Sequence, residues 1–441
     1  MKITVVGTGY VGLVAGVGLA ALGHSVICFD IDEQKIRLLE KSELPIYEPG
    51  LQELLEEAVL KRRLSFTSKR EEAYEAADFI FVAVGTPSYS DGSANLTHIV
   101  NVCRDIGMYA KRDVTVVTKS TVPVGTNDAM KEWIRESVRT DISIHLVSNP
   151  EFLREGSGVH DFFHGDRIII GAETTEIAKR VGELYKSLSI EIFTTDVRSA
   201  EMIKYASNAF LATKISFINE ISNICEKIQA DVTEVAAGMG IDKRIGPHFL
   251  QAGIGYGGSC FPKDTNALVQ IAGNVAHDFR LLKAVIEVNN KQQASLVEKA
   301  EKVMNLRGKR VAVLGLSFKP NTDDIREAPS LMIIEQLLSL GANIIVYDPK
   351  AILHAKRILA NQVQYTTDID AAIMKADAAF IVTEWESIRT YPIVKYVQLM
   401  NEPILFDGRN CYALEKIEKY AVDYYSIGRR AIRRRDVSYA F

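Results

Sequence analysis

Residues 2–30 read KITVVGTGYVGLVAGVGLAALGHSVICFD. A short apolar run rich in β-branched residues is followed by closely spaced glycines, a segment of helical length and a second apolar run ending at Asp30. Gly23 stands where a glycine commonly ends a helix. No Lys, Arg, Asp or Glu lies between Ile3 and Phe29, as in a signal peptide or membrane span, but repeated glycines interrupt the run. The pattern therefore predicts a strand, a tight turn, a helix and a second strand.

The glycines form the pattern GxGxxG, which is typical of dinucleotide-binding turns when it follows a strand and opens a helix. Glycine lets the backbone turn tightly and approach a pyrophosphate, and the helix N-terminus presents free N–H groups to it. A carboxylate at the end of the second strand would bind ribose hydroxyls and repel a 2′-phosphate, so the sequence favours NAD over NADP. The residues concerned are Gly7, Gly9, Tyr10, Val11, Gly12 and Asp30.

Further cofactor candidates follow the next strands. Lys35 comes shortly after Asp30 and could reach the adenosine side, although a solvated lysine fits its spacing equally well. Thr86 and Thr121 follow the fourth and fifth strands, and ligands of open α/β sheets bind beyond the carboxyl ends of strands. A purely structural turn explains each threonine equally well.

The alternation of strands and helices predicts the rest of the fold. Short apolar strands continue to about residue 150, a mostly helical region follows with a long breaker-free stretch, and a strand–glycine pattern restarts at residue 310. The segment 340–348 repeats the spacing of 22–30. We therefore expect an α/β protein with two Rossmann-like doubly wound αβ domains, residues 1–198 and 303–441, joined by a helical central domain, residues 199–302, with a long connecting helix.

The composition is that of an ordinary folded protein of 441 residues, 47% hydrophobic and 24% charged, with a net charge of −4. It excludes disordered, collagen-like and disulfide-rich classes, and it offers no field that would attract nucleic acid or a membrane. Five scattered cysteines without a CxxC pair indicate a reducing compartment and no metal site, so we expect a cytoplasmic protein. An arginine cluster near the C-terminus predicts a solvated tail or helix face, with a polyanion-binding patch as the alternative: Arg429, Arg430, Arg433, Arg434 and Arg435.

Residues 253–264, GIGYGGSCFPKD, give the strongest indication of chemistry. Four glycines in six positions expose the backbone and let a ligand approach closely. Cys260 follows them, and Lys263 and Asp264 come about one turn later. A nearby cation lowers the pKa of a thiol and favours the nucleophilic thiolate. The alternative is a small buried cysteine in a flexible linker.

Two other groups are weaker indications. Lys204 and Asn208, at positions i and i+4, share a helix face and could hold a sugar hydroxyl or a developing oxyanion, although such a pair is more often on the surface. Residues 149–156, NPEFLREG, follow a strand and bring Glu151 and Glu155 near the ligand edge of the sheet. A charged loop explains these glutamates equally well.

Together these residues resemble the UDP-glucose/GDP-mannose dehydrogenase family. The matching stretches run almost from end to end of the chain, and their combination is highly specific: 7–12, 85–87, 119–123, 149–156, 204–208, 249–264, 315–326 and 406–409. The resemblance implies that UDP-glucose, two NAD⁺ and water give UDP-glucuronate and two NADH. The C6 alcohol becomes an aldehyde, a cysteine traps it as a thiohemiacetal, a second hydride leaves, and the thioester is hydrolysed.

The resemblance also implies roles for individual residues. The catalytic group would be Cys260 as nucleophile, Lys204 and Asn208 stabilising the alkoxide or oxyanion, Asp264 assisting thioester hydrolysis, and Glu151 as general acid/base with Thr121 through water. The NAD contacts beyond the glycine turn would come from Lys35, Thr86, Thr121, Glu155, Lys263 and Arg326. The UDP-sugar would contact Glu151, Phe152, Leu153, Arg154, Lys204, Asn208, Arg244, Phe249, Leu250, Gln251, Ala252, Gly253, Gly257, Lys319 and Arg409.

The resemblance implies an assembly as well. Arg244 and Arg409 would reach in from a neighbouring subunit, which implies a homodimer or a larger homo-oligomer formed through the long central helix. The second αβ domain carries Gly315–Lys319 in place of GxGxxG, so it is expected to bind the nucleotide sugar with Lys319 rather than a dinucleotide. The charged loop around Arg326 could instead be solvated.

Three alternatives remain at this point. The same chemistry could act on GDP-mannose or a UDP-N-acetylhexosamine, because such family members share the cysteine loop. A simple hydroxyacid dehydrogenase would share the first αβ domain and a Lys–Asn pair but needs no catalytic cysteine. An NAD-sensing scaffold without chemistry would need only the dinucleotide half.

Overall fold

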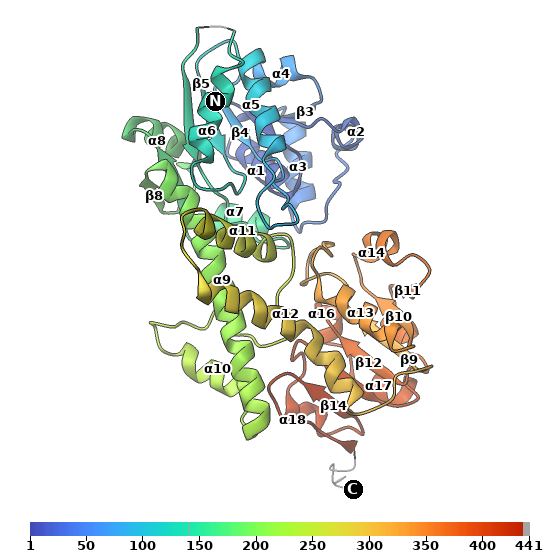
Figure 1. The fold of residues 1–441 in the computed structure, drawn as a ribbon. Helices are drawn as coiled ribbons and strands as arrows, with labels where there is room; N and C mark the ends of the chain where they lie inside the picture. Colours follow the sequence, from blue (N-terminus) through green and yellow to red (C-terminus); the bar gives the residue numbers. More distant parts are fainter. Residues whose placement is uncertain (140, 435–441) are drawn as a thin grey trace. The chain divides into compact units, whose positions relative to one another are not determined.

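The computed structural model describes residues 1–139 and 141–434, and the chain forms two compact units (Figure 1). Unit 1 comprises Met1–Ser207 and Asn266–His277, and unit 2 comprises Asn208–Thr265 and Asp278–Phe441. Two helices, α9 (Val197–Ile228) and α11 (Phe261–Asn274), contribute residues to both units. Each unit is built around one twisted sheet.

The sheet of unit 1 has eight strands in the order β3-β2-β1-β4-β5-β6-β7-β8. Strands β1 to β6 are parallel, β7 runs antiparallel to β6, and β8 is parallel to β7. The expected doubly wound parallel sheet is therefore extended by a reversed pair of strands. The strands are β1 (Lys2–Val6), β2 (Ser25–Phe29), β3 (Leu64–Thr67), β4 (Phe79–Val82), β5 (Val114–Thr118), β6 (Ile144–Ser148), β7 (Ile168–Ala172) and β8 (Ile192–Thr195).

Helices cover both faces of this sheet. One apolar core joins it to α1 (Tyr10–Ala21), α2 (Glu33–Glu40), α3 (Leu51–Leu60), α7 (Gly158–His164), α8 (Thr175–Gly182) and the short η1 (Glu183–Tyr185). A second core joins its other face to α4 (Arg70–Tyr74), α5 (Thr97–Tyr109) and α6 (Thr126–Arg135). Strands buried on both faces read as continuous apolar runs, as β4 does.

Helix α1 explains the uncharged N-terminal stretch of the sequence. It is buried from Gly12 to Ala20, so it has no polar face. A Cβ at Gly16 would lie 2.5 Å from Cys28 Sγ, and one at Gly18 would lie 2.4 Å from the Phe162 ring. The glycines therefore let α1 pack closely against β2 and α7. None of the helices in residues 1–139 and 141–434 is long and apolar enough to cross a membrane.

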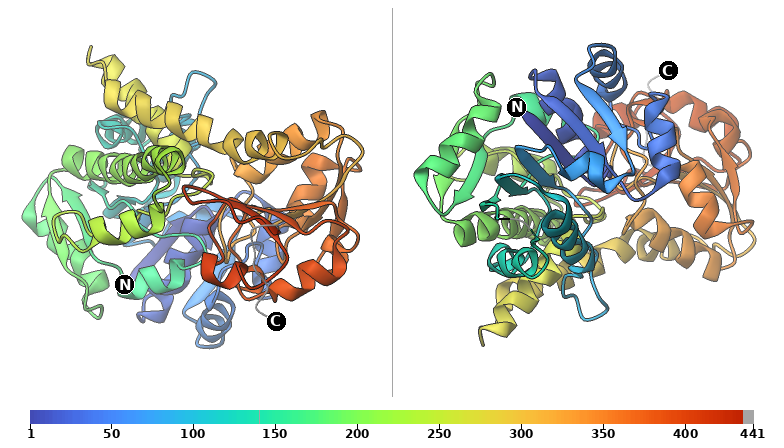
Figure 2. Two further views of the ribbon diagram at one scale, coloured as in Figure 1. Left: turned by 90° about the horizontal axis from the view of Figure 1, so that it is seen from below. Right: turned by 90° about the horizontal axis from the view of Figure 1, so that it is seen from above.

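The sheet of unit 2 has six strands, all parallel, in the order β11-β10-β9-β12-β13-β14. They are β9 (Arg310–Leu314), β10 (Asn343–Tyr347), β11 (Gln364–Thr366), β12 (Ala378–Ile381), β13 (Ile404–Asp407) and β14 (Asp423–Ser426). Helices pack on both faces, as Figure 2 shows from two directions. One core includes α10 (Val232–Gly240), α12 (Arg280–Glu301), α13 (Pro329–Ser339) and α14 (Ile352–Leu359), and the other α15 (Ile369–Ile373), α16 (Glu386–Arg389), α17 (Ile393–Leu399) and α18 (Leu414–Ile417).

The expected fold class, two Rossmann-like sheets with a helical region between them in the sequence, is confirmed. The three domain boundaries stay a prediction. The expectation of a solvated C-terminal arginine cluster is wrong for Arg429, which is buried and donates to Tyr412 O at 3.0 Å and Tyr424 Oη at 2.8 Å. Arg435 lies outside the described residues.

Candidate functional site

In the turn between β1 and α1, the fold requires glycine at two positions but not at a third. Gly7 has φ +97°, and a Cβ there would lie 2.8 Å from Ala83 O. A Cβ at Gly12 would lie 1.8 Å from Gly7 O. By contrast, apart from Gly9 and its two neighbours in the chain, no atom of the described residues lies within 4 Å of a Cβ built at Gly9. The fold could accept a side chain at Gly9, so the open space above the N-terminus of α1 suits a pyrophosphate.

Asp30 lies beside this turn. Its carboxylate accepts hydrogen bonds from Thr8 N at 2.8 Å, Thr8 Oγ1 at 2.7 Å and Asp32 N at 3.0 Å, and Lys35 Nζ is 3.9 Å away. Burial raises the pKa of Asp30, but the bonds from Asp32 and Thr8 and the charge of Lys35 lower it overall. An ionised carboxylate at this place can accept from ribose hydroxyls. The donor groups and open space present here fit NAD.

Two further turns end at the same edge of the sheet. Thr86 Oγ1 donates to Thr121 O at 2.9 Å, which ties the turn after β4 to the turn after β5. A Cβ at Gly85 would meet no atom within 4 Å. The structure thus brings both predicted threonines together beside a second open glycine.

Sequence reasoning missed Glu48, a buried carboxylate that holds the dinucleotide turn. Tyr10 Oη donates to its Oε2 at 2.5 Å, and the backbone N of Gly156 donates to the same oxygen at 2.7 Å. Tyr10 Oη also lies 3.0 Å from Arg154 O. Glu48 therefore ties the first residue of α1 to the loop that carries Glu155. No local pattern marks this glutamate, because its partners are far away in the sequence.

Glu151 and Lys204 form a buried pair in unit 1. Lys204 Nζ lies 2.9 Å from Glu151 Oε1 and donates to Glu151 O at 2.7 Å. Leu153 N donates to the other carboxylate oxygen at 2.6 Å. The Phe152 ring faces two cations, Lys204 Nζ at 5.3 Å and Arg167 at 4.1 Å from its centroid. These hydrogen bonds hold the buried pair in one geometry.

Arg154 and Arg326 are occupied elsewhere. The Arg154 guanidinium makes a two-point contact with Asp161, at 2.9 and 2.6 Å. Arg326 makes a similar contact with Asp324, at 2.9 and 2.7 Å, and is largely exposed. The roles predicted for both arginines stay predictions.

The loop 253–258 is closely packed. A Cβ at Gly253 would lie 2.8 Å from Gly408 O, and one at Gly257 would lie 2.1 Å from Glu327 O. At Gly255 (φ +85°) it would lie 2.7 Å from Asn289 Oδ1, and at Gly258 (φ +83°) 2.7 Å from the Phe318 ring. Each glycine thus meets a different segment of unit 2. This close packing counts against the flexible-linker alternative.

Cys260 directly precedes helix α11, and Asp264 follows one turn later. Asp264 N donates to Cys260 O at 2.8 Å, and the buried Asp264 carboxylate accepts from Asn208 Nδ2 at 2.6 Å. Lys263 Nζ lies 2.5 Å from Asp264 Oδ1. Lys263 therefore pairs with Asp264, and Cys260 itself stands directly before the N-terminus of α11.

Buried carboxamides hold the predicted sugar-binding stretch 249–253. Asn219 Oδ1 on α9 accepts from Gly253 N at 2.9 Å, and Gln292 Nε2 on α12 donates to Gly253 O at 2.8 Å. Phe249 has φ +64°, a strained value for a bulky residue. Leu250 and Ala252 are buried, whereas Gln251 is exposed.

The remaining sugar-binding candidates differ in exposure. Arg409 donates to Val382 O at 2.8 Å, Gly255 O at 3.2 Å and Phe318 O at 3.3 Å, so its guanidinium is used within its own chain. Its predicted contact with a neighbouring subunit stays a prediction. Arg244 is 89% exposed and contacts Asp242. Lys319 is half-buried, 5.4 Å from the Phe318 ring centroid.

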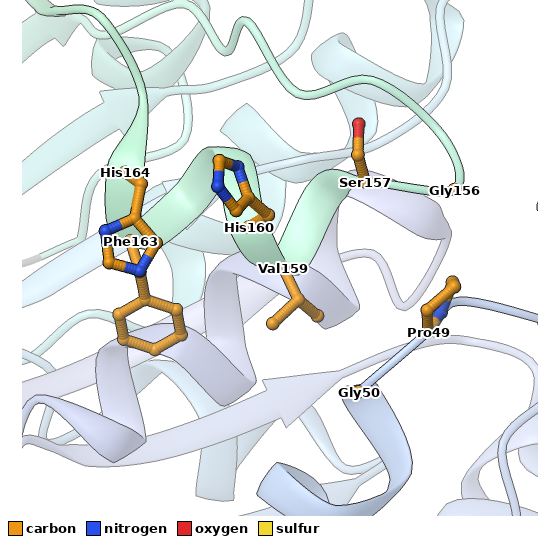
Figure 3. Close-up of a pocket in the computed structure, with 8 residues that line it drawn as sticks. All are labelled: Pro49, Gly50, Gly156, Ser157, Val159, His160, Phe163 and His164. Atoms are coloured by element: carbon orange, nitrogen blue, oxygen red, sulfur yellow. The ribbon is translucent and has the colours of Figure 1, made fainter.

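Two other features of the structure bear on ligand binding. Among the described residues, no group of three or more His, Cys, Asp or Glu side chains could hold a metal ion. Unit 1 has a pocket of about 440 Å³. Figure 3 shows residues of α7 lying across from Pro49 and Gly50 in this pocket. None of the predicted site residues is among those that line it: Pro49, Gly50, Gly156, Ser157, Val159, His160, Phe163 and His164.

Comparisons with known proteins agree over the length of the chain. Three stretches match models of the UDP-glucose/GDP-mannose dehydrogenase family: residues 1–189 its NAD binding domain, 198–291 its central domain and 312–414 its UDP binding domain. The chain is 57% identical to a UDP-glucose 6-dehydrogenase of Bacillus subtilis over 433 residues, 98% of either chain. Similar solved structures are a UDP-glucose dehydrogenase of Pyrobaculum islandicum (TM-score 0.91, 38% identity, 97% of this chain and 98% of that one) and a UDP-D-ManNAc dehydrogenase of Pyrococcus horikoshii (TM-score 0.85, 25% identity, 97% and 99%).

Proposed function

The chain belongs to the UDP-glucose/GDP-mannose dehydrogenase family, and on this premise we propose that it oxidises C6 of UDP-glucose to the carboxylate in two NAD-dependent steps. It is an oxidoreductase with an NAD binding domain and a UDP binding domain. The 57% identity to the Bacillus enzyme supports UDP-glucose as substrate. The simple hydroxyacid dehydrogenase and the NAD-sensing scaffold have no use for the cysteine loop.

One observation carries the covalent mechanism: Cys260 lies at the N-terminus of a helix whose first turn bears a buried Asp264 bonded to Asn208. The helix N-terminus favours a thiolate, which is the form that adds to an aldehyde. The second oxidation needs an aldehyde held in a form that can still lose a hydride. A thiohemiacetal is such a form, whereas a free aldehyde could escape or hydrate.

The oxidation at C6 takes place in two stages joined by a covalent intermediate. The C6 alcohol loses a proton and a hydride to become an aldehyde, and the Cys260 thiolate adds to its carbon. The adduct takes up a proton as the thiohemiacetal, which then loses that proton and a second hydride to give a thioester. Water adds to the thioester carbonyl, and the carbon–sulfur bond breaks to release the carboxylate, the thiolate and two protons. Bound NAD⁺ accepts the hydride in both oxidations.

We assign the proton transfers and charge stabilisation to the remaining polar groups. Glu151, paired with Lys204, is the general acid/base, with Thr121 acting through water. Lys204 and Asn208 stabilise negative charge on the C6 oxygen. Asp264 directs water at the thioester. The firm hydrogen bonds of Glu151 and Asp264 support these roles, because a reacting group must be held in place.

Binding residues complete the proposal. NAD is bound by the glycine turn, Asp30 and Lys35, together with Thr86, Thr121, Glu155, Lys263 and Arg326. The UDP-sugar is bound by Glu151–Arg154, 249–253, Gly257, Lys319, Arg244 and Arg409, the two arginines coming from a neighbouring subunit of a homodimer or larger assembly. Residues 1–198, 199–302 and 303–441 act as cofactor, connecting and sugar-nucleotide domains.

The substrate is tested by NADH production across UDP-glucose, UDP-galactose, UDP-N-acetylglucosamine and GDP-mannose. We expect UDP-glucose to give the largest kcat/KM. The similarity to a UDP-D-ManNAc dehydrogenase makes an N-acetylated sugar the second candidate. A preference for that sugar or for GDP-mannose would contradict the assignment of UDP-glucose as substrate, but it would not contradict the covalent mechanism.

A further inference from the structure

The glycine loop 253–258 lies outside the helices and strands, so its backbone N–H and C=O groups need hydrogen-bond partners from other segments. At Gly253 two helices supply them. Asn219 Oδ1 on α9 accepts from Gly253 N at 2.9 Å, and Gln292 Nε2 on α12 donates to Gly253 O at 2.8 Å. Carboxamide side chains therefore bind both polar groups of a residue that is proposed to contact the UDP-sugar.

Tyr256 is held in a similar way, by α12 alone. Asn289 Oδ1 accepts from Tyr256 N at 2.8 Å, and Asn289 Nδ2 donates to Tyr256 O at 3.1 Å. One side chain thus makes the two-point contact that a neighbouring strand makes in a sheet. Gln293 Nε2 donates to the same carbonyl at 3.1 Å. Tyr256 stands between Gly255 and Gly257, so these bonds fix the middle of the loop.

Five amide side chains surround the loop, and we call them the carboxamide cluster: Asn219, Asn223, Asn289, Gln292 and Gln293. Asn223 Nδ2 donates to Gln292 Oε1 at 3.1 Å, which links α9 to α12. Asn219, Asn289 and Gln292 are 0%, 3% and 1% exposed. Burying an amide is unfavourable unless it is hydrogen-bonded, so polar side chains at these buried positions need a reason. The loop supplies it, because its backbone needs these partners.

The turn after β13 binds the loop as well. Ile254 N donates to Gly408 O at 3.1 Å, and Arg409 Nη1 donates to Gly255 O at 3.2 Å. The loop is thus bound by three separate segments of unit 2, namely α9, α12 and this turn. The proposed mechanism gives the carboxamide cluster no role. Its amides carry no charge and exchange no proton, so holding the loop is the role that fits them.

We propose that Asn219, Asn289 and Gln292 are positioning residues for the nucleotide sugar, because they hold the glycine loop in one shape before the UDP-sugar binds. A ligand that meets an ordered loop does not bear the entropy of ordering it, so its affinity is higher. The three side chains act through the backbone of the loop and not by contact with the ligand. The inference rests on the proposed function only in placing the UDP-sugar at residues 249–253 and Gly257.

The main test is Asn289→Leu, which nearly keeps the side-chain size and removes both bonds to Tyr256. Hydrogen exchange, measured by mass spectrometry on peptides that cover 253–258, should become faster in this variant. Calorimetric titration should show UDP-glucose binding about tenfold weaker, because ordering the loop then opposes binding, and NAD binding unchanged. The matched control Asn290→Leu replaces an exposed asparagine of α12 and should change neither exchange nor affinity.

A third variant separates positioning from a general loss of stability. Ile417→Ala leaves a cavity in the core on the other face of the sheet of unit 2, and it should lower the unfolding free energy without weakening UDP-glucose binding. Gln292→Met, which removes the bond to Gly253 O, provides the comparison if Asn289→Leu does not fold.

Three results would overturn the proposal: unchanged exchange of the loop, faster exchange with unchanged UDP-glucose affinity, or equal losses of that affinity in Asn289→Leu and Ile417→Ala. A wild-type protein that binds no UDP-glucose would instead contradict the proposed function. Hydrogen exchange would in that case still show whether the carboxamide cluster holds the loop.

Discussion

The two αβ sheets use an equivalent carboxylate in different ways. Asp30 follows β2 and binds the turn after β1 through Thr8 N and Oγ1. Asp348 follows β10 and binds the turn after β9 through Leu316 N at 2.8 Å and Ser317 N at 3.1 Å. In both sheets the carboxylate therefore links the first two strands at the edge where ligands bind.

What differs is the access to that carboxylate. Trp385 Nε1 donates to Asp348 Oδ2 at 3.1 Å, and Asp348 is fully buried. The Asp30 side chain, by contrast, is 11% exposed to solvent. Helix α1 begins at Tyr10, directly after its turn, while α13 begins only at Pro329 after a longer loop. A carboxylate at this position is by itself only a structural link between two strands. A dinucleotide site also needs a partly exposed carboxylate and a glycine with free space beside it.

The largest expected effect comes from Gly315→Ala. Gly315 has φ +100°, and its Cβ would lie 2.4 Å from Thr383 Cβ, so the variant should lose about 3 kcal/mol of unfolding free energy from strain and overpacking. Urea denaturation measures it. Gly238→Ala on α10, where a Cβ meets nothing within 4 Å, is the control and should be neutral or slightly stabilising. Equal losses in both variants would contradict the close packing at Gly315.

Gly9→Val should produce the opposite phenotype in the first sheet. Because a Cβ at Gly9 meets no protein atom, the fold should keep its stability, while the side chain fills the space for the pyrophosphate. We expect NAD affinity to fall by about 100-fold, or about 2.7 kcal/mol. Calorimetric titration with NAD, beside a denaturation curve, separates the two effects. Normal NAD binding would show that the turn is not the cofactor site.

Asp30→Asn and Asp348→Asn should differ in what they damage. Removing the charge of Asp30 should weaken NAD binding about tenfold, because a charge-assisted hydrogen bond to the ribose is lost. It should also reduce the preference for NAD over NADP, because the repulsion of the 2′-phosphate is lost. Asp348→Asn should lower stability and leave NAD affinity unchanged. The ratio of the dissociation constants for NAD and NADP is the readout. A weaker NAD site in Asp348→Asn would remove the distinction.

The smallest expected effect is a change in stability at acidic pH. The pKa of Asp30 is lowered in the folded protein, so its contribution to stability is present above its unfolded value near 4 and is lost as pH falls below that value. The difference in unfolding free energy between the wild type and Asp30→Asn should be constant from neutral pH to about pH 5 and shrink below about pH 4. Urea denaturation across that range measures it. A difference that grows on acidification would contradict the assignment.

Local sequence patterns sufficed for the elements that carry the fold. The strand–GxGxxG–helix unit, the breaker-free α9 and the restart at β9 follow from periodicity and glycine spacing alone. The absence of GxGxxG after β9 also indicated that the second sheet is a poor dinucleotide site. The reversed β7 was missed, because strand direction depends on pairing between distant segments.

The parts that the sequence did not indicate depend on side-chain contacts. Lys263 stands near Cys260 in the sequence, and in the structure it pairs with Asp264, so its predicted effect on the Cys260 thiol stays a prediction. Glu48 and Trp385 carry no motif, and their significance lies in partners that only the fold brings to them. Spacing predicts which residues share a helix face or a sheet edge, but it cannot say which of two nearby charges forms the pair.

The most direct test of the central claim is the amount of NADH released per UDP-glucose consumed by the purified protein. Two oxidations joined by a covalent step at Cys260 predict about two NADH per UDP-glucose, with no free aldehyde, and Cys260→Ser should bind NAD without net turnover to the carboxylate. One NADH per UDP-glucose, or full turnover in Cys260→Ser, would contradict the account.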